Sequence, residues 1–172
     1  TSKNIVITGA SRGIGLALVK WFSAHHHMVW ALSRNTTPIT QLNLPNVTVN
    51  ALDLTNEDGV VSWAQNEAPD TIDALINNAG KLVNKPFAET TQSDFEGVFK
   101  VNVFGLANLT RALLKKLQPT GHVVNISSMG GIGGTSKFPG LTAYSSSKGA
   151  VSILTELLAE ELKEAGPAVN AL

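Results

Sequence analysis

Short apolar runs alternate with longer segments of helical periodicity along the whole chain. The apolar runs lack the polar alternation of a half-exposed sheet, as is typical of parallel strands covered on both faces. They occupy residues 4–8, 27–33, 47–52, 72–77, 122–127 and 167–172. Helical patterns lie between them, over residues 13–24, 57–67, 95–117 and a last segment that carries Tyr144 and ends near Glu164. This order predicts an α/β fold with a parallel sheet and helices on both faces.

The composition narrows the class of protein. The 172 residues are 43% hydrophobic, which is enough for one domain with a sizeable core. Thirteen basic residues balance thirteen acidic ones, so we expect neither nucleic acid nor a membrane as a partner. The chain has no cysteine, which excludes disulfides and thiolate metal sites and fits a reducing compartment. No apolar run approaches a membrane span, and we expect a soluble, cytoplasmic protein.

A glycine-rich turn, "TGASRGIG" (residues 8–15), follows the first predicted strand and opens the first predicted helix. In this context Gly9 fits a tight turn, while Gly13 and Gly15 let the backbone approach a pyrophosphate. Free N–H groups at the helix start would face the phosphates. A turn without a ligand is the alternative, but the strand and helix on either side favour phosphate binding. The pattern predicts a Rossmann-like, doubly wound dinucleotide-binding domain.

Tyr144 is the only tyrosine of the chain, and Lys148 follows it in "TAYSSSKGAV" (142–151). On a helix these two positions share one face. A free phenol has a pKa near ~10 and is a poor base at neutral pH, but a nearby ammonium stabilises the phenolate and lowers that pKa. The pair is either a tuned acid–base group or the surface of a solvated helix.

Six motifs in this order resemble the short-chain dehydrogenase/reductase family. They are "TGASRGIG" (8–15), "DL" (53–54), "NNAG" (77–80), Asn102 in "VNVFG", "ISS" (126–128) and "YSSSK" (144–148). Each motif alone is weak, but all six in order are specific and span nearly the whole chain. The resemblance implies that residues 1–172 form a single NAD(P)-binding Rossmann-fold domain that transfers a hydride to or from a nicotinamide.

The resemblance also implies catalytic roles for four residues. Tyr144 would exchange a proton with the substrate oxygen, and Lys148 would lower its pKa and hold the nicotinamide ribose. Ser128 would hydrogen-bond the carbonyl oxygen and the charge that develops on it. The backbone carbonyl of Asn102 would hold a water in a proton relay to Lys148. Ser127 remains an alternative active hydroxyl, although Ser128 matches the second serine of the family motif.

The second predicted strand ends in "ALSRN" (31–35), without the acid that would bind a ribose 2′-hydroxyl and repel a 2′-phosphate. Arg34 can pair with a phosphate, and Arg12 projects toward the same adenosine end in related proteins. These features favour NADP(H) over NAD(H). With the resemblance, the expected cofactor-binding residues are Gly9, Ser11, Arg12, Gly13, Ile14, Gly15, Ser33, Arg34, Asp53, Leu54, Asn78, Ala79, Gly80, Tyr144 and Lys148.

We therefore expect an NADP-dependent oxidoreductase that interconverts a small or medium ketone or aldehyde and its alcohol. The direction of the reaction in cells stays open, although the preference for NADP suggests reduction. Two other functions stay open: a catalytically silent NADP-binding regulator, and an epimerase or dehydratase on the same fold. The segment "GGIGGTSKF" (130–138) lengthens the interval from Ser128 to Tyr144 beyond the family's commonest spacing and bears on substrate shape. Relatives continue past the sixth strand, so we expect the C-terminal strand region to be missing.

The long predicted helix carries more apolar surface than one face of a sheet needs, at Phe95, Phe99, Phe104, Leu106, Leu109 and Leu113. Through the resemblance, this surface implies a homodimer or homotetramer. The run "HHH" (25–27) is interpreted as a solvated turn rather than a metal site, because adjacent side chains point in different directions. The three tryptophans, Trp21, Trp30 and Trp63, are expected to pack on apolar faces.

Overall fold

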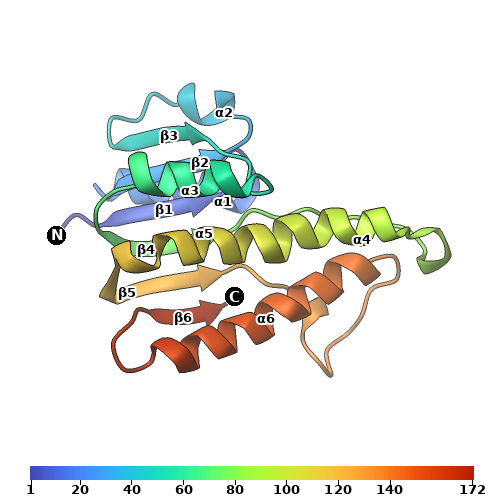
Figure 1. Cartoon of the computed structure of the whole chain (residues 1–172). Coiled ribbons are helices and arrows are strands. Elements are labelled where there is room, and N and C mark those ends of the chain that lie inside the picture. Colours follow the sequence, from blue (N-terminus) through green and yellow to red (C-terminus); the bar gives the residue numbers. More distant parts are fainter.

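The computed structural model describes residues 1–172 and contains one six-stranded sheet whose neighbouring strands are all parallel. The strands lie in the order β3-β2-β1-β4-β5-β6 (Figure 1). Their bounds are β1 Asn4–Thr8, β2 Met28–Ser33, β3 Val47–Ala51, β4 Ile72–Asn77, β5 Leu117–Asn125 and β6 Ala168–Ala171. Each predicted apolar run contains one of these strands or part of one, and the predicted α/β fold is confirmed.

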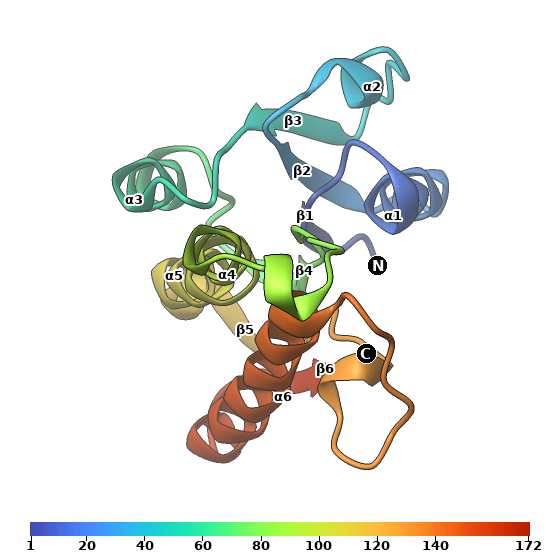
Figure 2. The same cartoon turned by 90° about the vertical axis from the view of Figure 1, so that its right-hand side faces the viewer.

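Helices cover both faces of the sheet (Figure 2). One face is covered by α1 (Gly13–Ala24) and the short α2 (Thr37–Thr40), and the other by α3 (Glu57–Asn66), α5 (Leu106–Leu113) and α6 (Thr142–Leu162). Figure 1 shows α4 (Gln92–Phe99) and the first turns of α6 extending past the carboxyl ends of the strands. Side chains on these two segments can therefore meet a ligand bound at that edge of the sheet.

The two faces of the sheet form two separate apolar cores. Val6 of β1 packs in the core under α3, α5 and α6, whereas its neighbours Ile5 and Ile7 pack in the core under α1. Successive side chains of a strand point to opposite faces. The central strands β1, β2 and β4 are mostly apolar because both of their faces are covered, as the sequence pattern predicted.

The helix predicted over 95–117 starts earlier than expected. The Thr91 side chain accepts a hydrogen bond from the Asp94 N–H, and the Asp94 carboxylate accepts one from the Thr91 N–H. This reciprocal cap begins α4 at Gln92. Apolar periodicity does not show a cap made by polar residues, so the predicted start was too late.

The same helix is also interrupted and ends early. A π-helical segment (Lys100–Gly105) joins α4 to α5, and a 3-10 turn (Leu114–Lys116) ends it. Leu117 is the first residue of β5 and pairs with Ile72 of β4. Leu117, which the sequence pattern assigned to the helix, therefore belongs to β5 because it pairs with β4.

Two local expectations were wrong. Trp21 is 52% exposed and stacks on His25, with ring centroids 4.0 Å apart, whereas Trp63 is buried in the core as expected. The segment between β2 and β3, for which the sequence pattern predicted no helix, contains α2, where Pro38 lies in the first turn and Ile39 is buried. Proline suits a first helical turn because the N–H it lacks has no partner there.

Candidate active site

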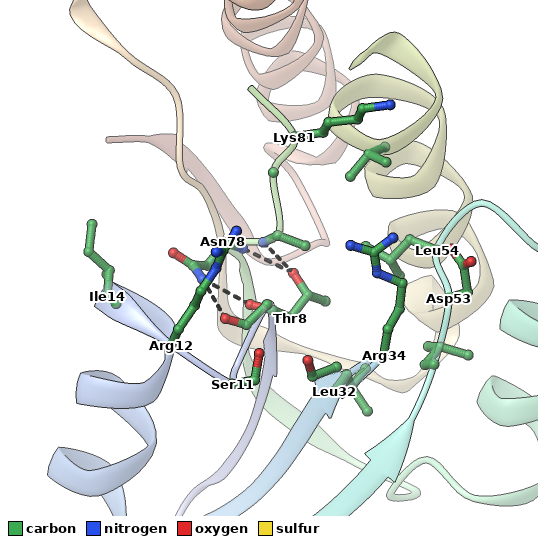
Figure 3. A pocket seen from close by; sticks show the side chains of 17 residues that line it. Thr8, Ser11, Arg12, Ile14, Leu32, Arg34, Asp53, Leu54, Asn78 and Lys81 are labelled. Atoms are coloured by element: carbon green, nitrogen blue, oxygen red, sulfur yellow. Dashed lines mark hydrogen bonds between the residues drawn. The ribbon is translucent and has the colours of Figure 1, made fainter. Parts of the chain in front are cut away.

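A cavity of about 300 Å³ lies at the carboxyl ends of β1 and β4 (Figure 3). The strand order reverses at β1, because β2 lies on one side and β4 on the other. Doubly wound sheets bind ligands in the crevice at such a point. The lining consists of Thr8, Gly9, Ser11, Arg12, Gly13, Ile14, Leu32, Ser33, Arg34, Leu52, Asp53, Leu54, Asn78, Ala79, Gly80, Lys81 and Val101.

The cavity gathers all the expected cofactor-binding residues except Gly15, Tyr144 and Lys148. These residues come from the turns after β1, β2, β3 and β4, which are far apart in the sequence. Sequence reasoning missed five lining residues, namely Thr8, Leu32, Leu52, Lys81 and Val101. Thr8 is the last residue of β1 and Leu32 is the residue before the last of β2, and this position at the carboxyl end of a parallel strand was the available signal.

Thr8 fixes the glycine turn to the segment after β4. Its hydroxyl oxygen accepts hydrogen bonds from the N–H groups of Asn78 and Ala79, both at 3.0 Å. The Asn78 side-chain amide donates in return to the carbonyl oxygens of Thr8 and Gly9, at 3.1 and 3.2 Å. The two walls of the cavity are therefore held together by side chains of the "TGASRGIG" and "NNAG" motifs.

Two glycines of the turn leave no space for a side chain. Gly9 has φ +64°, and a Cβ there would lie 2.8 Å from the Cα of Ala79. A Cβ on Gly15 would lie 2.3 Å from the Gly9 carbonyl oxygen. Gly15 therefore allows helix and turn to pack closely, which explains why it does not line the cavity itself.

The cavity carries an excess of positive charge. Arg12, Arg34 and Lys81 line it without forming a salt bridge, and Asp53 is the one acid of the lining. The Thr55 N–H donates to the Asp53 carboxylate at 2.9 Å. That bond is the main reason that the pKa of Asp53 lies below its ordinary value, and Arg34 adds a smaller effect. Figure 3 shows Arg34 on the side of Asp53 and Arg12 on the opposite side.

The expected catalytic helix reaches this cavity at Gly80. Tyr144 and Lys148 lie in the first two turns of α6, and a Cβ on Gly80 would lie 3.9 Å from Lys148 Nζ. Gly80 lines the cavity. The Lys148 ammonium is therefore next to the cavity wall, although neither Lys148 nor Tyr144 is part of the lining.

The ionisation of Tyr144 differs from the expectation. Burial raises the pKa of the Tyr144 phenol above its ordinary value of 10.0, and burial lowers the pKa of the Lys148 ammonium below 10.5. We expected Lys148 to lower the phenol pKa, but its ammonium bonds the Ile126 carbonyl oxygen and lies 5.7 Å from the Tyr144 ring centroid. The phenol of this structure therefore stays protonated at neutral pH.

The structure distinguishes the two adjacent serines after β5. Ser127 is buried, and its hydroxyl donates to the Lys148 carbonyl oxygen at 3.0 Å and lies 3.0 Å from Ser152 Oγ. Ser128 is half-buried, and its oxygen accepts a hydrogen bond from the Gly130 N–H at 3.3 Å. Only the Ser128 hydroxyl keeps its proton free for another acceptor, which favours Ser128 as the active hydroxyl.

Asn102 lies in the π-helical segment and is buried. Its side-chain oxygen accepts from the Lys81 N–H at 2.7 Å, and its amide nitrogen donates to the Lys81 carbonyl oxygen at 3.0 Å and to Ser147 Oγ at 2.9 Å. The side chain is therefore occupied by the protein, which leaves the backbone as the part that could hold a water. Single π turns inside α-helices occur frequently at functional sites.

The lengthened loop between Ser128 and α6 is held by its own side chains. The Thr135 hydroxyl donates to the Met129 and Ile132 carbonyl oxygens, and the Lys137 ammonium donates to the Ile132 carbonyl oxygen at 2.6 Å. Gly140, with φ +85°, accepts a hydrogen bond from the Lys85 N–H at 2.9 Å. The loop is thus folded on itself and touches the segment after β4.

The side chains of the histidine run bond protein groups at the end of α1 and near the start of the chain. His25 bonds the Trp21 carbonyl oxygen at 2.7 Å through Nδ1, and His27 Nδ1 accepts from the Lys3 N–H at 3.1 Å. The structure contains no group of three or more His, Asp or Glu side chains placed to hold a metal ion. None of its helices combines the length and the apolar character that crossing a membrane requires.

A parallel sheet with a basic cavity at its switch point defines a nucleotide-binding protein of the Rossmann type. The family model "short chain dehydrogenase" matches residues 3–172. The chain therefore belongs to the short-chain dehydrogenase family.

Two similar curated proteins are longer than this chain. The "Uncharacterized oxidoreductase YusZ" of Bacillus subtilis is 34% identical over 93% of this chain and 60% of its own length. "Carbonyl reductase [NADPH] 2" of Sus scrofa is 33% identical over 91% of this chain and 64% of its own length. The chain thus spans about three fifths of the length of these relatives.

Solved structures share the fold closely. A short-chain dehydrogenase from Streptomyces avermitilis has a TM-score of 0.90 at 33% identity, covering 99% of this chain and 65% of its own. The Pseudomonas aeruginosa RhlG/NADP active-site complex has a TM-score of 0.88 at 27% identity, covering 98% and 70%. A short-chain dehydrogenase/reductase from Burkholderia phymatum in complex with NAD has a TM-score of 0.86 at 28% identity, covering 99% and 63%. The similar structures thus include one complex with NADP and one with NAD.

Proposed function

We propose that the protein is an NADPH-dependent reductase of small or medium ketones and aldehydes, which it converts to alcohols. The observation that supports this proposal best is the position of Gly80, which lines the basic cavity and lies next to Lys148 Nζ. A cofactor in the cavity would therefore have one end beside the helix that carries Tyr144. Family membership and the similarity to an NADPH carbonyl reductase support the same reaction class.

The residues of the cavity fit a dinucleotide phosphate. Arg12 and Arg34, neither with a salt-bridge partner, line opposite sides of the cavity (Figure 3), and Gly13 has open space beside it. Backbone N–H groups at the start of α1 suit the pyrophosphate. Arg34 beside Asp53 suits a 2′-phosphate, because no acid ends β2. We therefore propose NADP(H) rather than NAD(H).

NADPH, when bound, supplies the hydride. Tyr144 gives its phenolic proton to the carbonyl oxygen of the substrate, since its raised pKa keeps the phenol protonated at neutral pH. Ser128 donates a hydrogen bond to the same oxygen and stabilises the negative charge that develops there. With the cofactor bound, Lys148 would hold the nicotinamide ribose, because its ammonium lies next to Gly80 of the cavity wall. The Asn102 carbonyl would support a water that restores the proton of Tyr144.

We also propose that the protein forms a homodimer or homotetramer. Phe104, Ile153 and Leu157 are 57%, 57% and 62% exposed on the π-helical segment and α6. Burying such apolar side chains between copies would be favourable. Sedimentation velocity tests this proposal: Leu157→Lys should shift the protein toward the monomer, whereas Lys115→Ala on the exposed surface should not.

The reductase proposal is tested with a panel of ketones and aldehydes and NADPH, followed at the cofactor's absorbance. Consumption of NADPH with at least one carbonyl, and equimolar alcohol formation, is the expected result. Tight NADPH binding without turnover of any carbonyl would instead support the catalytically silent regulator. NADPH binding should be measured separately, by its fluorescence, so that the two results are distinguished.

A further inference from the structure

The hydroxyl of Ser147 joins two parts of the site inside the protein. Ser147 has no exposed surface, and Asn102 is 1% exposed. The Asn102 amide nitrogen donates to Ser147 Oγ at 2.9 Å, and the Ser147 hydroxyl donates to the Tyr144 carbonyl oxygen at 2.6 Å. A single side chain thus links the π-helical segment to the residue that carries the phenol.

The other end of this link reaches the cavity. Both polar atoms of the Asn102 amide bond the backbone of Lys81, which follows Gly80 directly. Gly80 in turn lies next to Lys148 Nζ. The hydrogen bonds therefore connect the cavity wall to α6 through Asn102 and Ser147. Gly80, at the same part of the wall, also lies next to Lys148 of that helix.

We propose that Ser147 is a positioning residue, which acts through Asn102 to set the distance between Tyr144 and the cofactor cavity. This inference rests on the proposed function, because it assigns Ser147 a part in that reaction. Misplacement of a reacting group by roughly 1 Å can cost about 100-fold in rate. Asn102 and Ser147 have little freedom to move, because both are buried and each is hydrogen-bonded to its neighbours on both sides.

The three serines between Tyr144 and Lys148 are not equivalent. Ser146 is exposed and its side chain forms no hydrogen bond, whereas Ser147 is fully buried and forms two. Replacement of Ser147 by alanine would leave one N–H of Asn102 without its acceptor in a buried place, which is unfavourable. Ser146→Ala removes a hydroxyl from the same helix without this effect, so it is the matched control.

The first experiment separates binding from catalysis. In Ser147→Ala we expect kcat per NADPH-loaded protein to fall about 10- to 100-fold, with the NADPH Kd changed by less than about 3-fold. Ser146→Ala should match the wild type in both. If Ser147→Ala keeps the wild-type kcat at full NADPH loading and loses only thermal stability, the hydroxyl is structural and the proposal is overturned.

The second experiment tests whether the effect passes through Asn102. Ser147→Ala is combined with Asn102→Ala in a double-mutant cycle on kcat. The added loss from Ser147→Ala should shrink to about 3-fold or less in the Asn102→Ala background, because the link is already broken there. Equal losses in both backgrounds would contradict the proposed route.

A third readout does not depend on turnover. Tyr144 is the only tyrosine, so protein grown with 3-fluorotyrosine gives one ¹⁹F resonance. With NADPH bound, Ser147→Ala should shift and broaden this resonance relative to Ser146→Ala and the wild type. An unchanged resonance would contradict the positioning role. If the wild type binds NADPH but reduces no carbonyl, the reductase proposal fails, while this comparison still decides the role of Ser147.

Discussion

Lys148 donates a hydrogen bond from its ammonium to the carbonyl oxygen of Ile126. Ile126 follows β5, and the next residue, Ser127, donates to the carbonyl oxygen of Lys148. The lysine is therefore held at both its side chain and its backbone by two consecutive residues. The Lys148 ammonium therefore lies at the end of the sheet, beside Gly80. Burial is then the main influence on the pKa of Tyr144, and it raises that pKa.

Removal of the phenolic hydroxyl should stop the reaction without disturbing cofactor binding. Tyr144 does not line the cavity, so Tyr144→Phe should change the NADPH Kd by less than about 3-fold. Its kcat should fall by a factor of about 100 to 10,000, the usual contribution of a positioned acid. Stopped assays with NADPH and the best carbonyl of the panel measure this. Ordinary rates in the variant would show that another group supplies the proton.

The pH dependence follows from the raised pKa of Tyr144. The phenol donates in its protonated form, which persists up to the pKa, and burial places that pKa above 10.0. The kcat of NADPH-dependent reduction should therefore stay level from about pH 7 to 9 and fall above about pH 10. Initial rates at saturating NADPH give the profile. A fall centred near pH 7 would point to a different acid.

Arg34 should distinguish the two nicotinamide cofactors. It lines the cavity beside Asp53 without a salt-bridge partner. Arg34→Ala should weaken NADPH binding about 10- to 100-fold and NADH binding by less than about 3-fold, because only NADPH carries the 2′-phosphate. Fluorescence titration measures both. Lys20→Ala, an exposed cation away from the cavity, is the control, and equal losses for the two cofactors would refute the phosphate role.

Gly15 should tolerate no side chain. A Cβ would lie 2.3 Å from the Gly9 carbonyl oxygen and 2.6 Å from the Asn78 amide nitrogen. Gly15→Ala should lower the free energy of unfolding by about 1–3 kcal/mol, a typical cost of overpacking. Denaturant unfolding measures the loss. Gly133→Ala, with nothing within 4 Å and no positive φ, should change stability little, and the same loss in both variants would contradict the steric explanation.

Asp94 should contribute stability that acid removes. The Lys85 ammonium, with smaller effects from Thr91, lowers the pKa of Asp94 from 3.8 to about 2. Because the folded pKa lies below the unfolded one, the stabilisation is complete above pH 3.8 and is lost as the pH falls through about 2. The Tm difference between wild type and Asp94→Asn should therefore narrow over this range. A constant difference for Asp94→Asn would contradict the assignment.

The parallel sheet was predictable because both faces of the central strands β1, β2 and β4 are covered, so these strands appear in the sequence as apolar runs. The ends of the helices were harder to predict from the sequence. The start of α4 depends on hydrogen bonds between Thr91 and Asp94, and the end of the helix depends on the pairing of Leu117 with Ile72. Trp21 shows another limit, since an apolar residue can lie on an exposed helix face and stack on His25.

The walls of the cavity were predictable because the motifs follow the carboxyl ends of neighbouring strands. The pKa direction at Tyr144 was not, since it depends on burial and on where the Lys148 ammonium bonds. The choice between Ser127 and Ser128 also required coordinates, because only the contacts with Lys148 and Ser152 separate the two hydroxyls. Spacing in the sequence places side chains on a face but does not select their partners.

The loop between Ser128 and α6 is held by hydrogen bonds of its own side chains rather than by bonds to the sheet. Thr135 and Lys137 satisfy carbonyl groups of the loop itself, and Gly140 makes its contact with Lys85 through the backbone. A segment of this kind can be replaced by one of another length while the strands that anchor it keep their register. Changes within this loop can therefore alter the surroundings of Ser128 without altering the sheet beneath it.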